Sequence, residues 1–178
     1  QWDRLAIRHV NVSKATVLVR HVPESNIPFW LSGAESMSDR QSDPVAKHEV
    51  KLQDDEDADL TSWIDLAQLV PRPERGVYEI TVRHKTGKDV VRLVRTELQV
   101  IAKGGAYDKG EETVDVWVVD AHTGGPRPDV TVKLLQMSGK PMGTCLTDLS
   151  GWCAISRAAD PSDDRGATTL IVSDGDDV

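Results

Sequence analysis

The sequence predicts an all-β protein made of two tandem antiparallel β-sandwich domains. Val114, Val116 and Val118 occupy every second position of one run, which is the two-residue period of a strand with one buried face. Similar short runs recur along the chain, and glycine, proline and aspartate separate them every few residues. Many short strands with frequent turn signals are typical of a β-sandwich.

The first domain is expected over residues 1–96. Its predicted strands cover residues 5–10, 15–22, 45–52, 76–82 and 90–94. Residues 32–43 are polar and predict a long surface loop. Residues 60–70 are the only stretch with a helical period, since Leu60 and Ile64 recur at helical spacing and Pro71 ends the pattern. Asp59, Thr61 or Ser62 is expected to cap this short helix.

The second domain is expected over residues 97–178. Its predicted strands cover residues 98–102, 113–119, 130–137, 143–147, 152–156 and 168–172, and the glycines after residue 102 are interpreted as a break. A seven-stranded sandwich needs one more strand, and residues 173–176 have the composition of the turn that introduces it. We therefore expect this domain to lack its last strand.

Composition narrows the range of partners. The chain has 178 residues and a formal net charge of −8, which argues against nucleic acid or an anionic membrane as the main partner, because both need basic surface. No apolar run approaches the roughly 20 residues of a membrane span. Because the first residue is Gln1 and not methionine, the chain is expected to be processed or cut from something longer.

No motif predicts catalysis. Lys85-Thr86-Gly87 matches the K-T-G of penicillin-binding enzymes, but no S-x-x-K supplies a nucleophile, so a hairpin turn is the favoured interpretation. The histidines are scattered without metal-ligand spacing; they are His9, His21, His48, His84 and His122. P-loop and G-x-G-x-x-G motifs do not occur. We expect no enzyme, no catalytic residue, no metal and no cofactor.

Two polar stretches have a functional and a plain interpretation. Asp55, Asp57 and Asp59 begin like a calcium loop, but Leu66 stands where the bidentate glutamate belongs, and a solvated loop is favoured. The tripeptide that begins at Asn11 is a glycosylation sequon, which matters only in a secreted eukaryotic protein.

The two cysteines are the candidate covalent site. Cys145 and Cys153 flank the turn at residues 148–151 on two predicted strands. A disulfide between them and a pair of buried free thiols are both open, because the sequence does not fix the register. Pairing would imply an exported protein, and the absence of C-x-x-C argues against redox catalysis.

Several motifs resemble bacterial alpha-2-macroglobulin chains. In the first half they are G-V-Y-E-I-T-V at residues 76–82 and L-Q-V-I-A-K at 98–103. In the second half V-W-V-V-D at 116–120 leads to T-G-G-P at 123–126, then V-T-V-K-L at 130–134, G-T at 143–144, T-D at 147–148 and S-G at 150–151. The resemblance implies consecutive macroglobulin-like β-sandwiches, related to immunoglobulin and fibronectin-III folds, from the N-terminal part of a protease trap.

The resemblance implies a non-catalytic scaffold fragment of a broad-spectrum protease inhibitor that is periplasmic or exported. Its implied partners are other domains of the parent chain, and proteases are the parent's targets. The thioester of the family has the form C-x-E-Q, whereas Cys145 and Cys153 precede L-T-D and A-I-S. No thioester and no bait segment is therefore expected here.

A second hypothesis is an immunoglobulin-like adhesion or ligand-binding module of another exported protein. That module would carry an exposed aromatic patch. The residues that decide between the two hypotheses are Trp2, Trp30, Trp63, Trp117 and Trp152.

Overall fold

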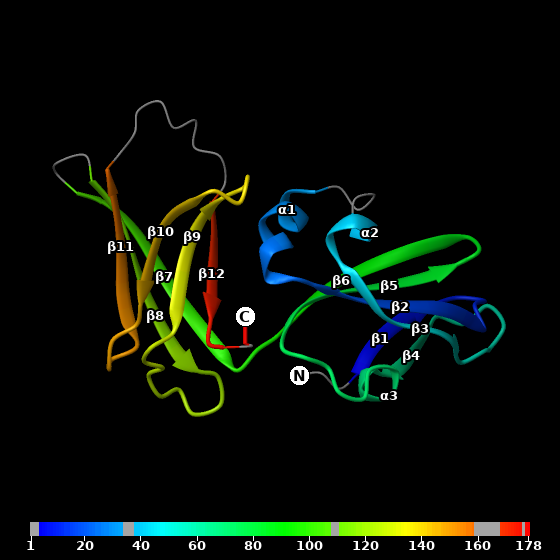
Figure 1. Cartoon of the computed structure of the whole chain (residues 1–178). Coiled ribbons are helices and arrows are strands. Elements are labelled where there is room, and N and C mark those ends of the chain that lie inside the picture. The colour runs from blue at the N-terminus through cyan, green and yellow to red at the C-terminus, as the bar shows by residue number, and fades with distance from the viewer. Residues whose placement is uncertain (1–3, 34–37, 108–110, 159–167, 176) are drawn as a thin grey trace. The chain divides into compact units, whose positions relative to one another are not determined.

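The computed structural model describes residues 4–33, 38–107, 111–158, 168–175 and 177–178. The chain divides into two compact units (Figure 1). Unit 1 comprises Gln1–Pro23 and Asp39–Arg95, and unit 2 comprises Glu24–Ser38 and Thr96–Val178. Every paired strand is antiparallel, so the predicted all-β sandwich class is confirmed.

Unit 1 is a small sandwich of a four-stranded and a two-stranded sheet. The larger sheet has the order β3-β2-β5-β6, with β3 at Asp43–Lys51, β2 at Lys14–Val22, β5 at Gly76–His84 and β6 at Gly87–Arg95. The smaller sheet pairs β1 (Arg4–His9) with β4 (Leu60–Asp65). The apolar side chains of β2 alternate along the strand because every second one must enter the space between the sheets.

The core of unit 1 lies on one face of the larger sheet. Val17, Val19 and Ile80 are fully buried there, and Leu5 and Ile7 of β1 pack against the same cluster. Tyr78 is also buried, and its hydroxyl donates to the backbone carbonyl of Glu74 at 2.8 Å. The two-residue period seen in the sequence of β2 thus gives the sheet its buried face.

The helix predicted over residues 60–70 is wrong for its first half. Leu60–Asp65 is strand β4, and only Leu66–Leu69 is helical (α3). Ser62 and Ile64 are buried while Trp63 is 61% exposed, which is the alternation of a strand paired with β1. The cap is Asp65, whose Oδ1 accepts from the backbone N–H of Ala67 at 2.9 Å.

Helix also occurs where the sequence predicted none. Residues 24–26 form the 3₁₀ turn η1 (Glu24–Asn26), which leads into α1 at Ile27–Ser32. Within the predicted loop 32–43, Ser38–Gln41 forms the four-residue helix α2, and residues 34–37 lie outside the described part. Among the described residues, no helix is both long and apolar enough to cross a membrane.

Unit 2 is a sandwich of two three-stranded sheets. One has the order β11-β8-β7, with β11 at Trp152–Ala158, β8 at Glu111–Asp120 and β7 at Leu98–Tyr107. The other has the order β10-β9-β12, with β10 at Pro141–Leu146, β9 at Thr131–Gln136 and β12 at Thr168–Ser173. Strand β7 continues past the expected end at residue 102, because Gly104 and Gly105 pair with β8 instead of turning the chain.

The core of unit 2 is aliphatic and draws on both sheets. Val116, Val118 and Ile155 come from one sheet, and Val132 and Leu134 from the other. The sheets approach closely at Gly143, where an added Cβ would lie 2.2 Å from Cγ2 of Ile155. Glycine is therefore required at that position by packing.

A segment of the first half of the sequence clusters with unit 2. Nζ of Lys133 on β9 lies 2.7 Å from Oε1 of Glu24, and the ring of Phe29 lies against Gly139. Trp30 of α1 is buried, with 3% of its surface exposed. The sequence predicts this segment as part of the first domain, because no local pattern signals a contact between residues about a hundred positions apart.

Candidate functional site

The T-G-G-P motif forms a closed turn around Asp120 at the end of β8. Oδ1 of Asp120 accepts from the backbone N–H of Thr123 at 2.9 Å and from that of His122 at 3.0 Å. The backbone of Asp120 also bonds to both glycines of the motif, with the N–H of Gly124 and the carbonyl of Gly125 each at 2.8 Å. A carboxylate capping its own turn is a structural arrangement.

The second half of the motif forms another closed turn at residues 147–151. Oδ1 of Asp148 accepts from the backbone and the hydroxyl of Ser150 at 2.8 and 2.6 Å. The hydroxyl of Thr147 accepts from the N–H of Val130 at 2.9 Å and donates to the carbonyl of Arg127 at 2.7 Å. Thr147 thus connects this turn to the segment that follows the first.

Both turns meet β8 at Val118. The N–H of Val118 donates to the carbonyl of Gly151 at 2.8 Å, and its carbonyl accepts from the N–H of Arg127 at 3.0 Å. We call this arrangement of Val118, Arg127 and Gly151 the β8 junction. Gly151 has φ of 76°, and an added Cβ would lie 2.4 Å from the Val118 carbonyl oxygen. Only glycine fits there.

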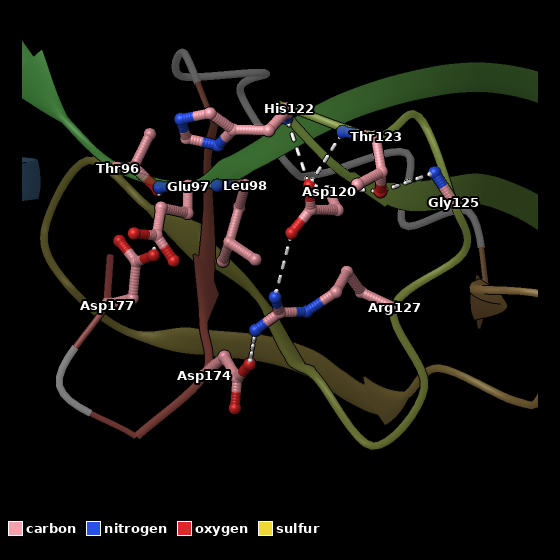
Figure 2. Close-up of polar contacts among 10 residues, drawn as sticks. All are labelled: Thr96, Glu97, Leu98, Asp120, His122, Thr123, Gly125, Arg127, Asp174 and Asp177. Carbon is pink, nitrogen blue, oxygen red and sulfur yellow. Dashed lines mark hydrogen bonds and ion pairs between the residues drawn. The ribbon is translucent and has the colours of Figure 1, made fainter.

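The side chain of Arg127 extends the junction to the last described residues of the chain. Figure 2 shows its guanidinium between two carboxylates. One guanidinium nitrogen lies 3.2 Å from Oδ2 of Asp120, and the other contacts Asp174. Asp174 and Asp177 bond to each other through their backbones at 2.8 and 3.1 Å, which forms the turn predicted at residues 173–176.

Asp177 fastens this turn to the start of β7. The residue is 1% exposed, and its Oδ2 accepts from the backbone N–H of Glu97 at 2.9 Å (Figure 2). The first and last strands of unit 2 are therefore connected by one buried carboxylate. The absence of a seventh strand stays a prediction.

The charges of this cluster are stabilised as ions. Hydrogen bonds from the backbones of Thr123 and His122 lower the pKa of Asp120 to about 2. The contact with Asp174 raises the pKa of Arg127. In the neighbouring turn, the hydroxyl of Ser150 and then the N–H of Trp152 lower the pKa of Asp148. Carboxylates held ionised in this way are poor proton donors or acceptors near neutral pH.

The structure brings the two cysteines together in a disulfide. Cys145 on β10 and Cys153 on β11 are bonded, with their Cα atoms 6.0 Å apart. These strands belong to different sheets, so the bond joins the two layers at one edge of unit 2. Cys153 is buried and is part of the aliphatic core.

An exposed apolar row crosses the sheet on the outside of unit 2. Ile101 is paired with Trp117, which is paired in turn with Trp152, so the three side chains lie side by side on adjacent strands. They are 57%, 37% and 37% exposed. We call Ile101, Trp117 and Trp152 the aromatic row. The register that creates it could not be read from the sequence.

The other tryptophans do not extend this patch. Trp30 is buried and Trp63 is exposed on β4 of unit 1, while Trp2 lies outside the described residues. Among the described residues, the tryptophans therefore form the exposed aromatic patch expected of a binding module in one place, the aromatic row.

The acidic residues 54–59 contact strand β1 and the residues that follow it. The guanidinium of Arg8 holds the carboxylate of Asp59 and lowers its pKa, and the side chain of Asn11 bonds Oδ1 of Asp57 at 2.9 Å. The asparagine of the sequon is thus used within the fold. Within the described residues, no three metal-ligating side chains gather at one point.

The K-T-G triplet and two of the histidines make local structural contacts, and Nε2 of His9 lies 2.8 Å from the hydroxyl oxygen of Ser62. The triplet belongs to the turn between β5 and β6, and Nδ1 of His84 lies 3.1 Å from Oγ1 of Thr86 there. His21 packs at 5.0 Å against the ring of Tyr78. The arrangement of the motif residues therefore supports turns and strand junctions, and the exposed feature suited to contact is the aromatic row.

These features define a class of fold: tandem antiparallel β-sandwiches, with a disulfide between the two sheets of unit 2 and a turn motif fixed to β8. Solved structures with this fold include bacterial alpha-2-macroglobulins. No protein-family model and no curated protein matches the sequence.

One of the similar solved structures is the crystal structure of native alpha-2-macroglobulin from Escherichia coli spanning domains NIE-MG1. The TM-score is 0.70 at 16% identity, over 93% of this chain and 86% of that one. A structure spanning MG0-NIE-MG1 gives 0.70 at 18% identity, over 95% and 58% of the two chains. The Salmonella alpha-2-macroglobulin mutant Y1175G gives 0.64 at 16% identity, over 94% and 10%. The likeness is one of fold, and this chain spans about a tenth of the Salmonella one.

The β8 junction predicts a large difference between two glycine substitutions. Gly124→Ala should cost about 1–2 kcal/mol, because Gly124 has φ of 69° but its Cβ would meet no atom within 4 Å. Gly151→Ala should cost about 3 kcal/mol or more, since its Cβ also meets backbone atoms that cannot move aside. Urea unfolding followed by tryptophan fluorescence measures the loss of unfolding free energy for both variants. Equal losses would contradict the close backbone contact at the β8 junction.

The low pKa of Asp120 predicts a pH dependence of stability. Because folding lowers this pKa from 3.8 to about 2, the carboxylate stabilises unit 2 above pH 4 and loses this effect as the pH falls toward 2. Asp120→Asn should therefore have a lower free energy of unfolding than wild type at pH 6. The difference in unfolding free energy between the two proteins should shrink by pH 2. Asp54→Asn, at an exposed position, is the charge-matched control; an Asp120→Asn difference that stays constant with pH would refute the assignment.

Proposed function

We propose that this chain is a non-catalytic scaffold segment of a bacterial alpha-2-macroglobulin-like protease inhibitor. Its two units would correspond to the domains NIE and MG1 of the Escherichia coli protein. The observation that carries the proposal is the fold match over 93% of this chain with the NIE-MG1 structure. Both units contribute to a match of that length.

The engagement of the motif residues supports a non-catalytic role. The conspicuous polar side chains, Asp120, Arg127 and Asp148, are each committed to a turn or to one another. The cysteines are joined to each other, so in this state neither is available for a thioester. The segment would therefore hold a larger assembly together while other parts of the parent bind proteases.

The same disulfide supports export of the parent protein. Disulfides form and persist in oxidising compartments such as the bacterial periplasm or the exterior. We therefore place the parent in the periplasm or outside the cell. In that setting the bond between the sheets would stabilise unit 2 by about 2–3 kcal/mol for a loop of this length.

In the scaffold role, the aromatic row would dock a neighbouring domain of the parent chain. Three adjacent apolar side chains of this size are an interface feature, since aromatic residues dominate the energetics of buried contacts. The same row also favours the second candidate, an adhesion or ligand-binding module of another exported protein. The two candidates differ in whether the row is covered inside the parent molecule.

The test uses the complete product of the reading frame that encodes this sequence. After incubation with trypsin, it should suppress cleavage of casein while sparing a small chromogenic peptide, because an enclosed protease still admits small substrates. The isolated 178-residue chain at stoichiometric excess should suppress neither. A parent that leaves casein cleavage untouched, or an isolated chain that inhibits by itself, would contradict the scaffold role.

A matched pair of variants decides what the aromatic row does. Trp117→Ser in the complete protein should destabilise it against urea and weaken casein protection, whereas Trp63→Ser, at the exposed tryptophan of unit 1, should change neither. Acrylamide quenching checks coverage: Trp117 should be shielded in the parent and accessible in the isolated chain. Equal quenching in both would favour the binding module.

A further inference from the structure

A groove in unit 1 runs along an unpaired strand edge. Its volume is about 560 Å³, and it lies between β1 on one side and the β5–β6 hairpin on the other. Five successive residues of β1, residues 5–9, line it. Successive residues of a strand point to opposite faces, so a run of five reaches the same groove through the edge of the strand.

That edge of β1 has no partner within the described residues. β1 pairs with β4 alone, and its backbone groups make no other hydrogen bond to the described part of the chain. The sheet above the core therefore has two strands, while the sheet below has four. The groove is the space where a third strand of the upper sheet would lie, and open edges of this kind accept strands.

The floor and the rim of the groove differ in chemistry. Val82 and Val91 form a partly exposed apolar floor from the larger sheet, with Ile80 and Ala15 buried beside them. On the outward face of β1 the side chain of Arg4 is exposed, whereas the guanidinium of Arg8 is already paired with Asp59. An added strand would therefore place apolar side chains on the floor and a carboxylate outward beside Arg4.

A buried histidine at the end of β1 adds an unsatisfied polar atom. His9 lines the groove and is 8% exposed; its Nε2 lies 2.8 Å from Oγ of Ser62. That oxygen also accepts from the N–H of Gln53 at 2.8 Å. Nδ1 has no partner among the described residues. A backbone group of a bound strand would supply the missing partner.

We propose that unit 1 binds an extended polypeptide segment, with alternating apolar and acidic residues, as a third strand along β1. Backbone hydrogen bonds to the free edge would give affinity, and the alternation of side chains would give selectivity. The site is independent of the scaffold role proposed above, because it lies wholly within unit 1 and involves neither the aromatic row nor the disulfide.

The probe is an eight-residue peptide of alternating glutamate and valine, fluorescently labelled and titrated with the 178-residue chain by anisotropy. A peptide of alternating lysine and valine tests charge, and one with N-methyl groups on alternate amides tests strand pairing. We expect the acidic peptide to bind about fivefold or more tightly than the lysine peptide. N-methylation should abolish binding, and the β1 amides should gain protection from hydrogen exchange in the complex.

Two matched pairs of variants locate the site. Arg4→Glu should weaken the acidic peptide about fivefold and favour the lysine peptide, while Arg72→Glu, exposed elsewhere in unit 1, should change neither. Val82→Lys should abolish binding, while Val94→Lys, at a position 62% exposed, should leave it intact. Arg4 is a surface residue, so its result stands even if Val82→Lys fails to fold.

Several outcomes would overturn the proposal. Equal binding of the N-methylated peptide would mean that the groove takes apolar groups without adding a strand. Self-association of the chain that Val82→Lys abolishes would make a second copy the occupant. Absence of binding at millimolar peptide, or insensitivity to Arg4→Glu, would leave the acidic strand without a site.

Discussion

Unit 2 depends on a backbone junction at Val118. Its N–H bonds to the carbonyl of Gly151 at the end of one turn, and its carbonyl bonds to the N–H of Arg127 directly after another. The contact is possible because position 151 lacks a Cβ, which would otherwise lie 2.4 Å from the Val118 oxygen. Asp120 and Asp148 then hold the turns closed through hydrogen bonds to backbone N–H groups. The spaced motif of threonine, glycine and aspartate is thus one connected structure.

The same network holds the two ends of unit 2 together. Arg127 reaches from the junction to Asp174, and Asp177 bonds the start of β7, so the last described turn is fixed to the first strand. The disulfide acts at another edge, where it joins β10 to β11 across the two sheets. Charged and covalent links therefore stabilise the periphery, while Val116, Val118 and Val132 supply the apolar centre.

Strands and turns could be predicted because their signals are local. The alternation in β8 and the glycines of the two turns are visible in consecutive residues. The helix prediction was wrong for residues 60–65 because Leu60 and Ile64 fit the spacing of a helix as well as that of a strand. Only the pairing with β1 decides between the two structures. The aromatic row and the union of Glu24–Ser38 with unit 2 depend on register and on distant contacts, which no local pattern contains. The β1 groove likewise arises from an edge of β1 that is unpaired among the described residues, not from a motif.

The central claim is that the motif residues form a structural junction of unit 2. Amide hydrogen exchange measured by NMR tests it most directly. The N–H groups of Val118 and Arg127 should exchange only through global unfolding of unit 2, with protection equal to that of core strand amides. The N–H of Leu149, whose side chain is 88% exposed in the neighbouring turn, should exchange far faster. Exchange of Val118 and Arg127 at the rate of Leu149 would show that the junction does not hold in solution and would contradict the account.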